Sequence, residues 1–289
     1  MPSYESCIVT GKTILITGCS SGIGRCVADG LQRRGYRVFA TARQSRDVTQ
    51  LKEQGLESLQ LDLADSRSIL EAVDEVLARS HNRIDALFNN GAYGQAGAVE
   101  DLNREVLRAQ FETNLFGTAE LTNRIIPVMR KQGSGRIIMN SSVLGLVTLP
   151  YRGAYSASKF ALEGLADTLR LELAGSGISV SLIEPGPIVS RFRANSLEVF
   201  KRTINIEHSA HRRHYEGVLR RLEKPGPVAP FTLPPEAVLK HVIHALESRR
   251  PRRRYYVTVP THLFAALRRV LPYAALDWML ARVSRGENR

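Results

Sequence analysis

Three side chains in the middle of the sequence have types and a spacing that suit proton transfer to a carbonyl oxygen. Ser142 precedes Tyr155 by thirteen residues, and Lys159 follows Tyr155 by four. Residues four apart lie on the same face of a helix, so the Lys159 ammonium group is expected close to the Tyr155 phenol. A phenol has an unperturbed pKa of about 10, and a neighbouring positive charge lowers it. The spacing therefore predicts Tyr155 as a general acid and base, although such a pair alone is common on solvated helix faces.

A glycine-rich run lies upstream of these residues. Thr13–Thr17 is typical of a short strand, and a helix is predicted from Ile23 to Arg34. Glycines between a strand and a helix let the chain turn tightly and bring backbone amides close to a pyrophosphate. Together with Tyr155 and Lys159, the run indicates a nicotinamide-dependent oxidoreductase. The expected cofactor contacts in the run are Gly18, Ser20, Ser21, Gly22, Ile23 and Gly24.

The rest of the chain alternates predicted strands with predicted helices. Short apolar runs predict further strands at residues 37–41, 58–61, 86–89, 136–140, 179–183 and 255–259. Helical periodicity is found at about 66–79, 104–131, 154–174 and 235–247. Apolar strands separated by helices are typical of a parallel sheet that is covered on both faces. We therefore predict an α/β fold, a doubly wound Rossmann-type sheet of about seven strands with helices on both faces.

Composition favours one domain in a reducing compartment. The chain of 289 residues is 43% hydrophobic and has no long linker or internal repeat, so residues 1–289 are interpreted as a single Rossmann-type domain. Cys7, Cys19 and Cys26 fit neither a disulfide framework nor a zinc pattern. Residues 1–6 lack the features of a signal peptide, and the sequence contains no long uninterrupted apolar run. We therefore expect a cytoplasmic protein.

The net charge of +12 comes from the C-terminal third. Residues 1–189 carry 20 basic and 20 acidic side chains, whereas residues 190–289 carry 20 and 8. Such an excess suits an anionic surface, but a charged run is more often a solvated face. Nucleic acid is therefore not an expected partner. The basic stretch at 249–254 keeps a nucleic-acid binder or a regulator open as an alternative.

In its motifs the sequence resembles the short-chain dehydrogenase/reductase family, over about residues 10–260. The resemblance implies that Lys159 also holds the nicotinamide ribose, and that Ser142, rather than Ser141, meets the substrate oxygen. It implies that Asn114 bends its helix and holds a water between Lys159 and solvent. The matching motifs are Thr17-Gly18-Cys19-Ser20-Ser21-Gly22-Ile23-Gly24, Asp62-Leu63, Asn89-Asn90-Gly91, Asn114, Ser141-Ser142, Tyr155-Ser156-Ala157-Ser158-Lys159 and Pro185-Gly186-Pro187-Ile188.

The resemblance also implies further contacts with the cofactor. Asp62 would receive the adenine amino group, and Leu63 would contact the adenine through its backbone. A loop after the sixth predicted strand would fix the carboxamide. The cofactor residues that are implied in this way are Asp62, Leu63, Asn90, Gly91, Tyr155, Lys159, Pro185, Gly186, Ile188 and Ser190.

The end of the second predicted strand bears on the choice between NAD and NADP. A carboxylate there would bind the ribose hydroxyls and repel a 2′-phosphate, but the chain has Thr41 at this point and Arg43 two residues later. An arginine offers two parallel donors to a phosphate. The sequence therefore predicts NADP(H), with the Thr41 hydroxyl where the acid would otherwise be.

One position departs from the family pattern. Asn-Ala-Gly is usual, whereas this chain reads Asn90-Gly91-Ala92 and so places a methyl group where the family has none. Glycine is favoured where the backbone approaches a ligand closely. We expect the exchange to weaken cofactor or substrate binding without abolishing either.

The segments expected around the substrate are mostly apolar, which suits a hydrophobic carbonyl compound rather than a sugar. Within the family, the sequence most resembles bacterial NADP-dependent aldehyde reductases, in the subgroup of hydroxysteroid and retinol dehydrogenases. This implies reduction of aliphatic or retinoid aldehydes to alcohols. Hydroxysteroid or retinol dehydrogenase activity is the first alternative, and a non-catalytic NADP-binding regulator is the second. The expected pocket residues are Tyr93, Val143, Leu144, Leu149 and Phe192.

Two C-terminal segments are expected around the core. Residues 191–230 are polar and basic without a strong apolar period, which indicates a mobile substrate lid. His208, His211 and His214 recur in it, but they lack convincing partner ligands, so no metal is expected. Residues 261–289 form two amphipathic helical pieces that cap the pocket or make a subunit contact, with contact to an anionic membrane left open. The family resemblance implies a homo-oligomer.

Overall fold

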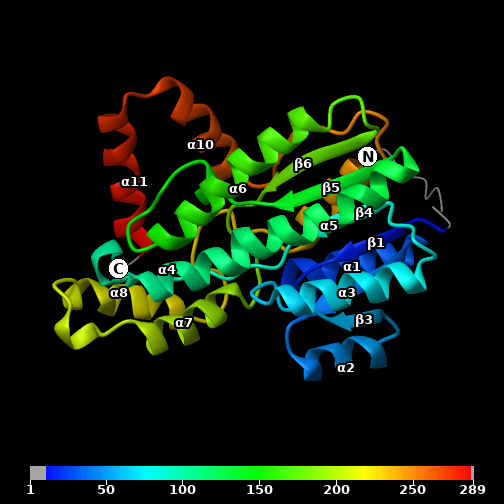
Figure 1. Ribbon diagram of the computed structural model, residues 1–289. Helices are drawn as coiled ribbons and strands as arrows, with labels where there is room; N and C mark the ends of the chain where they lie inside the picture. The colour runs from blue at the N-terminus through cyan, green and yellow to red at the C-terminus, as the bar shows by residue number, and fades with distance from the viewer. Residues whose placement is uncertain (1–10, 288–289) are drawn as a thin grey trace.

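The strands expected from the apolar runs form one sheet. The computed structural model describes residues 11–287, and its seven parallel strands run in the order β3-β2-β1-β4-β5-β6-β7. The strand order reverses between β1 and β4, which is where such sheets bind ligands beyond their carboxyl ends. The predicted doubly wound Rossmann fold is confirmed (Figure 1). The strands are β1 Thr13–Ile16, β2 Arg37–Ala42, β3 Glu57–Gln60, β4 Ala86–Asn89, β5 Gly135–Asn140, β6 Ile178–Glu184 and β7 Arg254–Tyr256.

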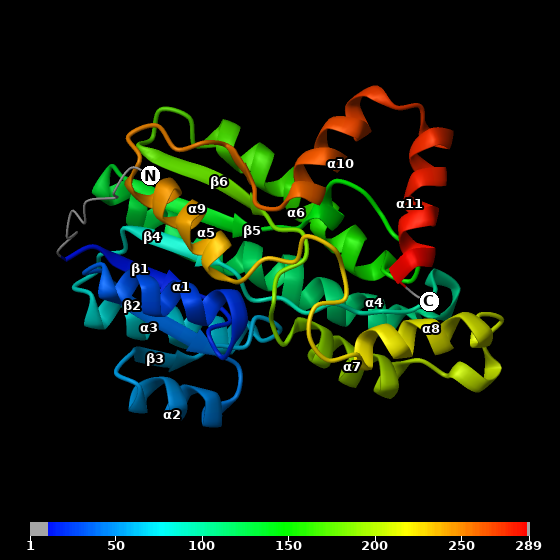
Figure 2. The ribbon, with the colours of Figure 1, turned by 180° about the vertical axis from the view of Figure 1, so that it is seen from behind.

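Helices cover both faces of the sheet. On one face lie α3 Ser66–Arg79, α5 Gly117–Gln132 and α6 Gly153–Glu172, and on the other lie α1 Gly22–Arg33, α2 Ser45–Glu53 and α9 Glu236–Glu247 (Figures 1 and 2). Side chains of a strand alternate between the faces, so Ile14 packs in the core under α1 and α9, and Leu15 packs under α3 and α5. Helix α2 was missed from the sequence because only two of its side chains, Val48 and Leu51, are buried.

The helix predicted over residues 104–131 is interrupted in the middle. Helix α4 Arg104–Phe111 continues into a π-helical turn, η2 Glu112–Phe116, before α5 begins. Asn114 lies in this turn and is buried. A single π turn inserted in a helix is frequent at functional sites. The local geometry therefore agrees with the implied irregularity of the helix at Asn114.

The segment predicted as a mobile lid is helical and packed. It forms α7 Phe192–Thr203, the short turn η4 Ile206–His208 and α8 Arg212–Glu223. Phe200 and Tyr215 are fully buried in the same apolar cluster as Ala154 of α6. The interpretation that this segment has no apolar period was wrong, because apolar side chains recur every three or four residues among many charged ones.

The C-terminal residues fold around Pro272 as expected. Helices α10 Val259–Val270 and α11 Tyr273–Glu287 lie on either side of it, and α11 (red) reaches down toward α8 in Figure 2. Leu276 and Leu280 of α11 pack against Phe264 and Val147. Helix α11 therefore folds back on the protein. None of the helices within residues 11–287 is long and apolar enough to span a membrane.

The remaining expectations concern the start of the chain, the cysteines and the histidines. Cys7 and the interpretation of residues 1–6 lie outside the described residues. Cys19 and Cys26 are free thiols. His211 Nε2 lies 2.5 Å from Glu100 Oε1. Across residues 11–287 no group of three or more His, Cys, Asp or Glu side chains is arranged to hold a metal ion.

Candidate active site

Ser142, Tyr155 and Lys159 meet at the carboxyl end of the sheet. Ser142 follows β5 and caps a short turn, η3 Val143–Gly145, where its Oγ accepts a hydrogen bond of 3.1 Å from Leu144 N. Tyr155 and Lys159 lie one turn apart near the start of α6, with Lys159 Nζ 5.7 Å from the centroid of the Tyr155 ring. All three line one cavity of about 890 Å³. The fold thus brings together the side chains that their spacing singled out.

Burial controls the acidity of Tyr155. It raises the pKa of Tyr155 to about 12, against smaller lowering effects of the Ser142 hydrogen bond and the Arg152 charge. The expected lowering of this pKa by Lys159 is not found, and Lys159 Nζ instead donates a hydrogen bond of 2.7 Å to the Asn140 carbonyl oxygen. Tyr155 therefore keeps its proton at neutral pH, as an acid that protonates a carbonyl oxygen must.

The charge of Lys159 depends on its surroundings. The side chain is only 3% exposed. Burial lowers the pKa of Lys159 to about 8, and the negative charge of Glu163 opposes this effect. A group that titrates so close to neutral pH responds to small changes in neighbouring charge.

Asn114 anchors the loop after β4. Its Oδ1 accepts a hydrogen bond of 3.2 Å from Tyr93 N, and its Nδ2 donates to Tyr93 O at 3.0 Å and to Ser158 Oγ at 3.1 Å. Tyr93 and Asn114 lie behind the cavity wall, which is formed there by Ala92 and Gly94. The expectation that Tyr93 lines the pocket was wrong, because the hydrogen bonds to Asn114 hold the backbone of Tyr93 behind Ala92 and Gly94.

The glycines after β1 occupy positions where a side chain would not fit. Gly18 and Gly22 have φ angles of +70° and +58°, which favour glycine. A Cβ atom on Gly24 would lie 2.2 Å from Gly18 O and 2.7 Å from Asn90 Nδ2. Helix α1 starts at Gly22, and the first residues of the helix line the cavity together with Ser20 and Ser21. This helix N-terminus fits the pyrophosphate of a dinucleotide.

Asn90 connects the ends of three strands. Its Nδ2 donates to Thr17 O at 3.0 Å, and its Oδ1 accepts from Asn140 Nδ2 at 2.9 Å. The amides of Asn90 and Gly91 donate to Thr17 Oγ1 at 2.9 and 2.7 Å. A Cβ atom on Gly91 would lie 3.2 Å from that oxygen, so glycine suits this loop, whereas the Ala92 methyl lies on the cavity wall. The predicted loss of affinity at Ala92 stays a prediction.

The residues expected at the adenosine end lie outside the cavity lining. Thr41 is 1% exposed, and its Oγ1 donates to Ile16 O at 3.1 Å, so its hydroxyl does not face a ribose. The expectation for Thr41 was wrong, because this side chain is buried and hydrogen-bonded to the neighbouring strand β1 instead of pointing out from the end of β2. Arg43 is exposed just beyond β2, and one Asp62 carboxylate oxygen accepts from Ala64 N at 3.0 Å. Leu63 is buried in the core.

The loop after β6 forms the part of the wall next to η3. Pro185 O accepts a hydrogen bond of 2.8 Å from Val143 N. A Cβ atom on Gly22 would lie 2.9 Å from Ser190 Cβ, so the far end of this loop touches the glycine-rich run. The predicted carboxamide residues that line the cavity are Pro185, Gly186, Ile188 and Ser190.

The remaining wall is apolar and comes from distant parts of the sequence. Val143, Leu144, Leu149 and Phe192 line the cavity as expected, and the Phe192 ring lies edge-on to Tyr155 with centroids 5.3 Å apart. Sequence reasoning missed other wall residues because no local pattern connects them with the site. These are Gln95, Ala96, Phe231, Leu263, Phe264, Leu280 and Val283.

Comparisons with known proteins agree with this geometry. Residues 12–199 match the family model described as short chain dehydrogenase. The chain is 43% identical to the Escherichia coli protein named uncharacterized oxidoreductase YbbO over 277 residues, which cover 94% of this chain and 97% of that protein. It is 35% identical to human 17-beta-hydroxysteroid dehydrogenase type 1, over 85% of this chain and 77% of the human protein.

A solved structure shows the same fold. A short-chain dehydrogenase from Streptomyces avermitilis superposes with a TM-score of 0.73 at 29% identity, over 96% of each chain. The chain therefore belongs to the short-chain dehydrogenase family of oxidoreductases. The resemblance noted from the motifs is confirmed, including the relationship to hydroxysteroid dehydrogenases.

Proposed function

We propose that this protein reduces apolar aldehydes, aliphatic or retinoid, to alcohols with NADPH. The observation that carries the proposal is the position of Ser142, Tyr155 and Lys159 in a cavity of about 890 Å³ whose remaining walls are mostly apolar. Ser142 holds the carbonyl oxygen, and Tyr155, which keeps its proton because it is buried, donates that proton to it. Lys159 holds the ribose. The bound cofactor supplies the hydride.

The substrate class is tested with a chain-length series of aliphatic aldehydes, together with retinal and a ketosteroid. Oxidation of NADPH, followed by absorbance, is expected to show kcat/KM rising by about fourfold for each added methylene until the cavity is filled, because each buried methylene contributes about 0.8 kcal/mol. NADH is expected to support much slower turnover. A rate independent of chain length would contradict an apolar substrate site.

The preference for NADPH rests on Arg43 and on the absence of a carboxylate at the end of β2, which reads Ala40-Thr41-Ala42. Arg43→Ala is expected to raise the Kd for NADPH by about 10- to 100-fold, because charge-assisted hydrogen bonds contribute about 1.5–3 kcal/mol. The Kd for NADH should stay the same. Fluorescence titration measures both constants.

Arg46→Ala is the matched control, because the Arg46 side chain is 82% exposed and lies on the neighbouring helix α2. It should change neither Kd by more than about twofold, since exposed charges contribute little. Equal weakening of NADPH and NADH by Arg43→Ala would show that Arg43 does not recognise the 2′-phosphate.

Two alternatives predict different results in the same assay. The 35% identity to human 17-beta-hydroxysteroid dehydrogenase type 1 favours a hydroxysteroid substrate, which would appear as turnover of the ketosteroid and not of the aldehydes. A non-catalytic regulator would bind NADPH and turn over none of the compounds. The basic C-terminal surface would then be the leading candidate for its function.

The proposal extends to the position of the protein in the cell and to its assembly. We place it in the cytoplasm as a homo-oligomer, and the exposed Phe116 of η2 and Leu165 of the adjacent α6 support an apolar subunit contact.

Segment 191–230 serves as the substrate lid, because Phe192 and Leu222 line the cavity. Helix α11 caps the pocket through Leu280. Exposed Trp278 beside Arg282 supports an additional peripheral contact with an anionic membrane.

A further inference from the structure

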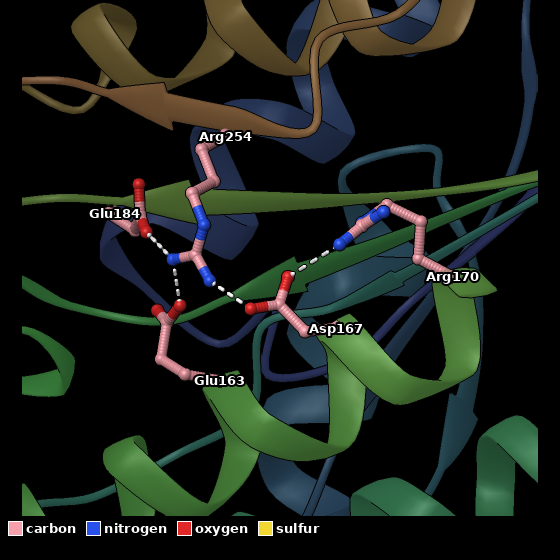
Figure 3. A network of polar contacts seen from close by, with 5 residues as sticks. All are labelled: Glu163, Asp167, Arg170, Glu184 and Arg254. Carbon is pink, nitrogen blue, oxygen red and sulfur yellow. Dashed lines mark hydrogen bonds and ion pairs between the residues drawn. The ribbon is translucent and has the colours of Figure 1, made fainter.

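A buried cluster of charged side chains lies behind Lys159. Arg254, the first residue of β7, contacts three carboxylates, those of Glu163 and Asp167 on α6 and of Glu184 at the end of β6 (Figure 3). Its Nη1 lies 2.5 Å from Glu184 Oε1 and also contacts the Glu163 carboxylate, and its Nη2 lies 2.5 Å from Asp167 Oδ2. Glu163 and Glu184 are 7% and 0% exposed. Buried charges require partners of this kind.

Three carboxylates meet two guanidinium groups in the cluster. Asp167 is shared between Arg254 and Arg170, which contacts it at 3.2 Å, so Glu163 and Glu184 depend on Arg254. Burial, together with the Glu163 charge, raises the pKa of Glu184 to about 8, and burial also raises the pKa of Glu163. Two adjacent buried carboxylates do not both ionise readily. At neutral pH the pair therefore favours a state with one proton, which the two carboxylates share.

The cluster supports the segments that carry the active site. Glu163 follows Lys159 by four residues and lies on the same face of α6. A Cβ atom on Gly145 would lie 2.7 Å from Ser141 Oγ and 3.0 Å from Glu163 Cγ, so Glu163 lies against the turn that follows Ser142. Glu184 directly precedes the cavity loop of β6. The same buried charges thus contact both sides of the site.

We propose that Glu163, Glu184 and Arg254 are positioning residues that keep Lys159 charged, with the proton shared by the two carboxylates setting how much negative charge faces the ammonium group. This inference rests on the proposed function. None of the three is among the residues that line the cavity. The other titratable or charged groups that face the cluster are Asp167 and Arg170 on α6, Tyr256 on β7 and Arg269 on α10.

The direction of the pH effect follows from the charges. Lys159 must be protonated for its ammonium group to donate hydrogen bonds to the ribose hydroxyls. Carbonyl reduction should therefore fall as the pH rises through the pKa of Lys159, which is about 8. The ionised Glu163 favours the charged form of Lys159, so its removal should move this fall to lower pH.

The test is the pH profile of kcat for carbonyl reduction by the full chain, with saturating NADPH. Glu163→Gln keeps the shape of the side chain and removes its charge. The basic limb of the profile, which is the fall in kcat at high pH, should therefore move to lower pH by on the order of one pH unit. Glu184→Gln should move it less, because glutamine resembles the protonated form, which burial favours for Glu184. Glu172→Gln removes the same charge from an exposed position on α6 and should leave the limb in place.

Arg254 provides a second test that does not depend on replacing a carboxylate. Without the guanidinium group the carboxylates take up protons, so Arg254→Met should also move the basic limb to lower pH. Arg254→Lys restores a positive charge, so its basic limb should lie close to that of the wild type. Thermal unfolding of each variant identifies any that is not folded. If Arg254→Met is unfolded, the test uses Arg254→Lys alone, and its basic limb should move to lower pH by a smaller amount.

Superimposable profiles for wild type, Glu163→Gln and the folded Arg254 variant would overturn the proposal, as would a larger shift for Glu184→Gln than for Glu163→Gln. The Kd for NADPH over the same pH range gives a readout independent of the substrate. If no carbonyl compound is reduced by the wild type, the proposed function fails. In that case the pH dependence of the Kd for NADPH still tests this inference. The affinity should fall as the pH rises through about 8, and this fall should move to lower pH in Glu163→Gln.

Discussion

Replacement of Tyr155 by phenylalanine is expected to lower kcat by about a thousandfold or more and to change the Kd for NADPH by less than about threefold. A positioned general acid contributes about 10²–10⁴ to the rate of a proton-transfer step, and in the proposed function the same hydroxyl, which is hydrogen-bonded to Ser142, also holds the carbonyl oxygen. Phenylalanine keeps the ring that lies edge-on to Phe192 at 5.3 Å, so the shape of the cavity is preserved. Steady-state kinetics and fluorescence titration of the same preparation separate the two effects.

Tyr273→Phe is the control for this substitution. It removes the same hydroxyl from a side chain that is 86% exposed, outside the cavity lining. Its kcat should equal that of the wild type. If Tyr155→Phe retained more than about a tenth of the activity, another group would have to supply the proton and the assignment of Tyr155 as the acid would be wrong.

Replacement of Gly24 by alanine is expected to weaken NADPH binding more than tenfold and to lower the free energy of unfolding by about 1–3 kcal/mol, as for other overpacked sites. The added methyl group would lie 2.2 Å from Gly18 O and 2.7 Å from Asn90 Nδ2. Both atoms belong to the hydrogen-bonded connection between the ends of β1 and β4, so relief of the clash must deform the glycine-rich loop that is proposed to bind the pyrophosphate. Urea unfolding and NADPH titration measure the two losses.

Gly164→Ala makes the same change where there is room for it. Gly164 lies on the exposed side of α6, and no atom lies within 4 Å of an added Cβ. Alanine in place of glycine within a helix should raise the free energy of unfolding by about 0.5–1 kcal/mol and leave NADPH binding unchanged. Equal results for the two variants would show that the close contacts of Gly24 do not control the cofactor loop.

The candidate catalytic side chains could be found from the sequence because their geometry is local. Tyr155 and Lys159 share one turn of one helix, and the glycines after β1 are required by one tight connection. The apolar runs likewise predicted the seven strands, most directly β1 and β4, which are mostly apolar and buried along their length. The helices of segment 191–230 were missed because their buried positions, such as Phe200 and Tyr215, are diluted by many charged residues.

The sequence by itself determined the family, the parallel sheet and the residues that suit proton transfer, because motif spacing and strand periodicity act over a few residues. Only the tertiary structure decided which way Thr41 points, since that depends on its hydrogen bond to Ile16 in a neighbouring strand. It also decided that burial, rather than Lys159, controls the acidity of Tyr155. The contact of Arg254 with Glu163, 91 residues away, likewise exists only because β7 lies beside β6 and α6 packs on that strand.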